Sequence, residues 1–318
     1  MDATIPSLIF AATLMAGQLP EGDSTTSASE QSVPTEVEAV VVVGERTREA
    51  AESFVRSVAA PVGGRKAAAW RNSVCVGVGG MRAEAAQLLV DRVSDWAHQL
   101  GLTVEPPGCR PQIFVVATTD GDGTARDLVA ARPDDFRTGM SGADQGAAAL
   151  ERFQTSGRLI RWWHVSLPVD GDTGLPIGRL PGQPPFAAPP RLASPSDFGS
   201  YGRRVTSSLI ADQTRDDLMQ AIIVLDVAVF DQANFSQISD YVTMVALAQI
   251  QADAEPAYPS ILRIFSGEGP QEESLTRWDQ AYLRAVYGAS QEYGGAGANL
   301  SSIALTLARE LELEDQPD

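Results

Sequence analysis

Apolar residues recur at helical spacing in several stretches of the chain, and residues 81–100 are the clearest case. Their apolar stripe consists of Ala85, Leu88, Leu89, Val93, Trp96 and Leu100. Steps of three and four place these side chains on one helix face, and Gly101 suits a C-terminal cap. Further helices are expected over 46–59, 125–131, 144–155, 235–250, the stretch after Thr276 and a final stretch through Leu311. Residues 235–250 are apolar nearly all round, which predicts a buried helix.

Five apolar runs between these helices predict strands. They cover residues 40–43, 73–78, 112–118, 159–167 and 222–229. Their lengths are typical of strands, and Gly44 is expected to end the first run. The strand–helix–strand order over residues 73–118 predicts a βαβ crossover with parallel strands. We therefore expect an α/β fold with a mixed sheet, in a single three-layer-like domain over residues 37–313.

The N-terminal segment predicts export to the periplasm or the exterior. Residues 5–15 form an apolar run of signal-peptide length, too short to span a bilayer, and residues 1–17 are the predicted signal peptide. Two features depart from an ordinary signal peptide. Asp2 precedes the run without any basic residue, and Leu14-Met15-Ala16 is a poor cleavage sequence.

Three other segments lack regular periodicity. Residues 18–36 are polar, acidic and rich in Ser, Thr and Pro, which predicts a disordered linker. Residues 168–200 hold many Pro and Gly residues and predict a long loop, a kind of segment that is often functional. Residues 314–318 predict a frayed acidic tail.

Composition and charge narrow the classes of partner. The chain has 318 residues and a formal net charge of −17. Such a charge repels nucleic acid and anionic membrane surfaces, so neither is an expected partner. No stretch is long and apolar enough to predict a transmembrane segment. The chain has two cysteines, Cys75 and Cys109, for which export favours one disulfide. The alternative is a pair of buried free thiols.

Histidine is scarce, which limits metal chemistry. The only two are His98 and His164, so a three-histidine zinc site is impossible, and the H-E-x-x-H motif is absent. His98 is expected on the polar face of a helix. His164 lies in a predicted strand beside Trp162 and Trp163, which favours packing in the core or at an edge; its functional reading is a binding cleft with an aromatic wall. No G-x-S-x-G motif, phosphate loop or dinucleotide motif is present, and no cofactor is expected.

Carboxylates are the remaining candidates for chemistry. Asp226 interrupts an apolar strand, so it must be paired or lie at the strand's functional end. Asp240 opens the buried helix segment, whereas Asp279 has the spacing of a helix cap with Thr276. No spacing in the sequence singles out a catalytic pair.

Several runs together resemble an uncharacterised family of exported bacterial proteins, over roughly residues 45–290. The runs are Cys75 with Cys109-Arg-Pro-Gln-Ile, Arg161-Trp162-Trp163, and residues 240–250, 260–265 and 275–287. That family implies no activity. The C-terminal order of strand, buried helix, loop and capped helix is also distantly similar to zincin-type metalloproteases. In those proteases the buried helix carries the H-E-x-x-H motif. In this chain residues 240–248 stand at the position of that motif, so no metal ligand can be assigned from the resemblance.

These observations favour an exported, non-catalytic binding or interaction module on a degenerate metalloprotease-like scaffold. This interpretation implies an open cleft beside the helix at 235–250, with Trp162, Trp163 and Tyr241 as possible lining residues. The partner is an unknown protein or cell-envelope component. The alternative is a hydrolase without a metal, using Asp226, Asp240 or His164 in that cleft. A third reading is a structural protein of the envelope.

Overall fold

The computed structural model describes residues 36–71, 73–136, 145–171, 174, 214–267, 272–289 and 295–314. Residues 41–318 form one compact unit, distinct from residues 1–40, and the fold below is that of the larger unit. The predicted signal peptide, all but the last residue of the predicted linker, and nearly all of the predicted 168–200 loop lie outside the described residues. So do residues 315–318 of the predicted tail.

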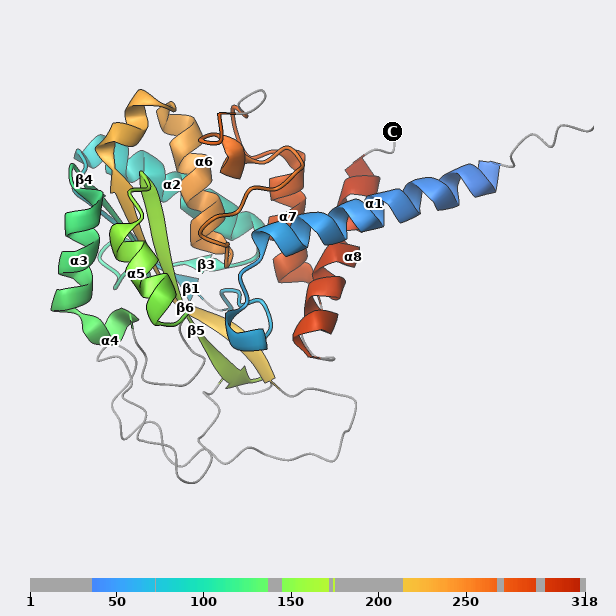
Figure 1. Cartoon of the computed structure of the whole chain (residues 1–318), viewed down its shortest axis with the longest axis horizontal. Coiled ribbons are helices and arrows are strands. Elements are labelled where there is room, and N and C mark those ends of the chain that lie inside the picture. Colours follow the sequence, from blue (N-terminus) through green and yellow to red (C-terminus); the bar gives the residue numbers. More distant parts are fainter. Residues whose placement is uncertain are drawn as a thin grey trace, which may run out of the picture. The chain divides into compact units, whose positions relative to one another are not determined.

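Strands and helices occur in short groups along the described part of the chain (Figure 1). The helices are α1 (Glu36–Val58), α2 (Ala83–Gln99), α3 (Gly121–Ala131), α4 (Pro133–Phe136), α5 (Ala147–Thr155), α6 (Phe235–Leu247), α7 (Arg277–Gly288) and α8 (Ala296–Glu314). Short 3₁₀ helices are η1 (Val62–Gly64), η2 (Val227–Asp231) and η3 (Ile261–Arg263). The strands are β1 (Ser73–Val74), β2 (Val76–Gly79), β3 (Thr103–Val104), β4 (Ile113–Thr118), β5 (Ile160–Asp170) and β6 (Thr214–Asp226).

The main sheet is mixed, as expected. Its strand order is β2-β4-β6-β5, with β2, β4 and β6 parallel and β5 antiparallel to β6. The chain passes from β2 through α2 to β4, which confirms the βαβ crossover. Gly80 makes the turn into α2 with a φ of 77°, and a Cβ there would overlap the Ala117 carbonyl. Only glycine fits such a position without strain.

Helices cover both faces of this sheet, so the domain has three layers (Figure 1). Neighbouring residues of β6 point to opposite faces because side chains alternate along a strand. Ile223 packs into the larger core, which α1, α2, α6, α7 and α8 complete, and Ile222 packs into the smaller core with α3, α4 and α5. The predicted α/β class and layered architecture are confirmed.

Helix α6 lies inside the larger core. Every residue from Gln237 to Leu247 is buried, as the all-round apolar pattern predicts. A capping box between Asn234 and Gln237 starts the helix, and α2, α7 and β6 pack around it. A second capping box, between Thr276 and Asp279, starts α7 as expected.

The two cysteines form a disulfide. Cys75 lies between β1 and β2, and its Cα is 6.1 Å from that of Cys109 in the loop before β4. The bond ties the two parallel strands of the crossover together. Of the two alternatives open from the sequence, the structure has the bridge.

The strand predicted at residues 40–43 is wrong. These residues belong to α1, which continues without a break through Gly44 to Val58. Valine favours strands only weakly, and one glycine costs a helix about 1 kcal/mol, which helix continuation can offset. The end of the strand predicted over 222–229 is also wrong, because β6 stops at Asp226. The Asp226 side chain accepts a hydrogen bond from the Ala228 amide and starts η2.

Candidate functional site

The described structure has a cavity of about 300 Å³ where β5 begins beside α6, and this is called the large cavity. Its lining comes from residues 157–160, from Gln232 and Tyr241, and from Ala254, Glu255, Leu262, Phe265 and Ser266. The volume lies at the lower end of the range for small-molecule sites, about 300–1,000 Å³. Of the three residues expected beside a cleft at the helix over 235–250, Tyr241 lines this cavity.

A smaller cavity of about 100 Å³ adjoins it, with Arg158 and Ile160 lining both. This small cavity lies where β5 begins, at the edge of the main sheet, and is lined from α5 and from the Ala252–Asp253 segment. The Arg158 guanidinium hydrogen-bonds to the Ala252 carbonyl oxygen. The Arg158 side chain is therefore a shared wall between the two cavities.

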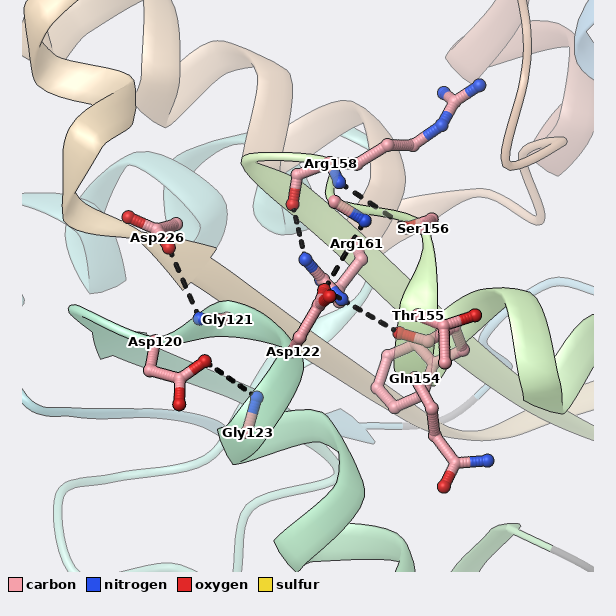
Figure 2. A network of polar contacts seen from close by, with 12 residues as sticks. Asp120, Gly121, Asp122, Gly123, Gln154, Thr155, Ser156, Arg158, Arg161 and Asp226 are labelled. Carbon is pink, nitrogen blue, oxygen red and sulfur yellow. Dashed lines mark hydrogen bonds and ion pairs between the residues drawn. The ribbon is translucent and has the colours of Figure 1, made fainter.

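A polar network fixes the start of β5 (Figure 2). Gly157 turns the chain into the strand with a φ of 65°, and its amide donates to Asp122 over 3.3 Å. Asp122 also pairs with Arg161, which is buried and donates to the Arg158 carbonyl over 2.8 Å. The hydrogen bond from Arg161 lowers the pKa of Asp122 and keeps it ionised. The network holds the backbone of Arg158, and Figure 2 shows the Arg158 side chain directed away from it.

Tyr241 connects this site to the core. Its ring packs edge-on against Trp162, with centroids 5.9 Å apart, and against Phe265 at 5.4 Å. Burial raises the pKa of the Tyr241 phenol, and the Arg158 cation opposes that rise. Among the residues that the structure describes, the Tyr241 hydroxyl has no hydrogen-bond partner. The phenol is therefore neutral and has a donor to offer a ligand.

The two tryptophans predicted for the cleft separate between the faces of the sheet. Trp162 packs in the larger core with Tyr241, whereas Trp163 packs in the smaller core against Phe136 and Phe153. Both line the small cavity at the sheet edge, and neither lines the large cavity.

His164 has a structural place. It is fully buried, and its Nε2 lies 2.7 Å from the Val245 carbonyl oxygen, so Nε2 carries the proton and donates. Burial lowers the pKa of His164 to about 4, which makes the imidazole neutral at pH 7. His164 lines neither cavity.

The hydrogen bond from His164 is one of several that side chains donate to backbone carbonyls at the C-terminal end of α6. The last carbonyl groups of a helix have no hydrogen-bond partner within the helix, and burying them unpaired would cost free energy. Trp70 Nε1 donates to Ala246 over 2.9 Å, and the Tyr287 hydroxyl donates to Leu247 over 2.7 Å. Trp162 Nε1 donates to the Ile250 carbonyl just beyond the helix over 3.0 Å. Side chains from β5, from α7 and from the loop before β1 thus satisfy this buried end.

The two candidate carboxylates lie in separate contacts. Asp240 is completely buried, pairs with Arg92 of α2 and accepts the Leu275 amide over 3.0 Å, which ties α6 to its neighbours. Asp226 ends β6 and accepts a hydrogen bond from the Gly121 amide over 3.2 Å (Figure 2). It also accepts one from the Ala228 amide over 3.0 Å. Neither lines the large or the small cavity.

Two charged residues of the large cavity escaped the sequence analysis. Arg158 precedes the tryptophan-containing strand and could have been singled out as a charge ahead of an apolar run. Glu255 carries no such signal, since it is one of 41 acidic residues. Their place beside the same cavity depends on tertiary contacts between segments about 100 residues apart.

Within the described residues, no group of three or more His, Cys, Asp or Glu side chains is placed to hold a metal ion. No described helix combines the length and apolarity that a bilayer crossing requires. Comparisons with protein-family models, with curated proteins and with solved structures found no match to this chain.

Proposed function

We propose that this chain is an exported, non-catalytic binding module that holds a small molecule in the large cavity. The observation that carries the proposal is the cavity itself, which has apolar walls from Leu262 and Phe265 and polar groups at Arg158, Tyr241 and Glu255. A few polar groups in an apolar concavity are typical of ligand sites. The hydrolase alternative has less support, because Asp226, Asp240 and His164 are engaged in contacts that stabilise the fold.

Export is part of the proposal. It is supported by the apolar run at residues 5–15 and by the Cys75–Cys109 disulfide, since disulfides persist in oxidising compartments. Fractionation of cells that express the full chain, with thiol labelling, tests it. Oxidised protein outside the cytosol is expected, and reduced protein in the cytosol would contradict export. Placement on a degenerate metalloprotease-like scaffold remains part of the proposal, and stoichiometric zinc in the purified protein would overturn it.

Binding in the large cavity is tested by filling it. Ser266→Trp places a bulky ring on the wall, and Ser301→Trp places the same ring at an exposed position on α8. Ligand-observed NMR with a library of soluble metabolites should give binders that Ser266→Trp abolishes and Ser301→Trp retains. A library with no such binder, with both variants folded by circular dichroism, would contradict the proposal.

A further inference from the structure

The large cavity carries one positive and one negative side chain that do not pair with each other. Arg158 and Glu255 both line it, both are exposed, and neither forms an ion pair with any residue that the structure describes. Opposite charges within 4 Å would have formed an ion pair, so the charged atoms of Arg158 and Glu255 lie farther apart than that. A ligand that carries both charges offers each side chain a complementary partner.

We propose that the large cavity binds a zwitterion of the α-amino acid class with an apolar side chain. The inference rests on the proposed function, that this cavity holds a small molecule, and it names the chemical class. The ligand carboxylate lies at Arg158, the ligand ammonium lies at Glu255, and the apolar side chain contacts Leu262 and Phe265.

The carboxylate assignment follows from the donors at Arg158. A guanidinium has five N–H donors in a planar fork that matches a carboxylate, and the bond to the Ala252 carbonyl leaves others available. The Tyr241 hydroxyl, which has no described partner, supplies a further donor. The network around Arg161 fixes the Arg158 backbone, so this donor set starts from a defined position.

The apolar side chain is assigned from the rest of the wall. Leu159, Ile160, Leu262 and Phe265 present hydrocarbon to the cavity, and the Tyr241 ring adds an aromatic surface. A volume of about 300 Å³ accommodates a single amino acid with its solvent, and it is too small for a folded polypeptide segment.

The test uses isothermal titration of the full chain with leucine, N-acetylleucine and leucinamide at pH 7. N-acetylleucine lacks the ammonium, and leucinamide lacks the carboxylate. Leucine should bind at least about tenfold more tightly than either analogue, which is the scale of one lost charge-assisted hydrogen bond. Equal affinity for leucine and N-acetylleucine, or for leucine and leucinamide, would overturn the proposal.

Two variants assign each charge to its side chain. Arg158→Gln should weaken leucine binding at least about tenfold and leave leucinamide unchanged, and Glu255→Gln should weaken leucine and leave N-acetylleucine unchanged. Arg152→Gln and Asp253→Asn are the controls, because these exposed residues carry the same charges and line only the small cavity. They should leave leucine affinity unchanged, and losses equal to those of the test variants would overturn the assignment.

The outcome also separates this inference from the proposed function. If amino acids do not bind but other compounds show binding that Ser266→Trp abolishes, the ligand class is wrong and the binding function stands. If no compound shows binding that Ser266→Trp abolishes, the proposed function fails and the inference fails with it.

Discussion

The stability of this protein should fall below neutral pH, because His164 takes up a proton in the unfolded chain before it does so in the folded chain. In the folded chain, burial lowers the pKa of His164 from 6.5 to about 4. Above pH 6.5 the imidazole is neutral in both states and contributes nothing to the pH dependence. As the pH falls from 6.5 to 4, only the unfolded chain takes up the proton, so stability is lost over this window.

The magnitude follows from that window. One pKa unit corresponds to about 1.4 kcal/mol, so lowering the pKa by 2.5 (6.5 minus 4) removes about 3.5 kcal/mol of unfolding free energy in total, of which about 3 kcal/mol is lost by pH 4. His164→Gln is the matched variant, because glutamine keeps an N–H donor for the Val245 carbonyl and does not titrate. The difference in unfolding free energy between wild type and His164→Gln isolates this one group from every other titration.

Urea unfolding at pH steps from 7.5 to 3.5, followed by tryptophan fluorescence, measures that difference. Wild type should lose about 3 kcal/mol relative to His164→Gln between pH 7 and pH 4. A difference that stays constant over this range would refute the argument that His164 is buried and neutral. His164→Phe, which leaves the Val245 carbonyl without its donor, should cost about 1–3 kcal/mol at pH 7.

Three further outcomes are expected. Replacing Cys75 and Cys109 by serine opens a bridge of sequence separation 34 and should lower the urea unfolding free energy by about 4 kcal/mol, and an unchanged midpoint would contradict this. Tyr287→Phe removes the donor to the Leu247 carbonyl and should cost about 1–3 kcal/mol by the same measurement, whereas a neutral effect would show that water replaces it. Burial raises the pKa of Asp279 from 3.8 to about 6, so the stability of wild type relative to Asp279→Asn should fall by about 2 kcal/mol as pH rises from 4 to 6; a rise would refute that direction.

The periodic segments were predictable because local spacing determines them. The stripe over 81–100 became α2, and the all-round apolar run became the buried α6, since burial of an apolar face dominates helix placement. The valine run at 40–43 failed for the opposite reason. Strand propensity is a weak preference, and the helix that follows extended back through it.

The contacts of single polar residues were less predictable. The sequence indicated His164 and Asp240 as candidate functional residues, but not their partners. His164 pairs with the Val245 carbonyl and Asp240 with the Arg92 side chain, and each partner lies on another element. Tyr241 was predicted beside a cleft from its position on the buried helix, and it lines the large cavity. The opposite charges of that cavity, Arg158 and Glu255, are adjacent to it only through tertiary folding.

The central claim, that the large cavity is a binding site for an apolar amino acid, is tested most directly by NMR. Backbone amide shifts of ¹⁵N-labelled protein would be followed during a leucine titration at pH 7. The account predicts saturable shift changes at Arg158, Tyr241 and Glu255, with none along α8. Shift changes confined to other surfaces, or none at millimolar leucine, would contradict it.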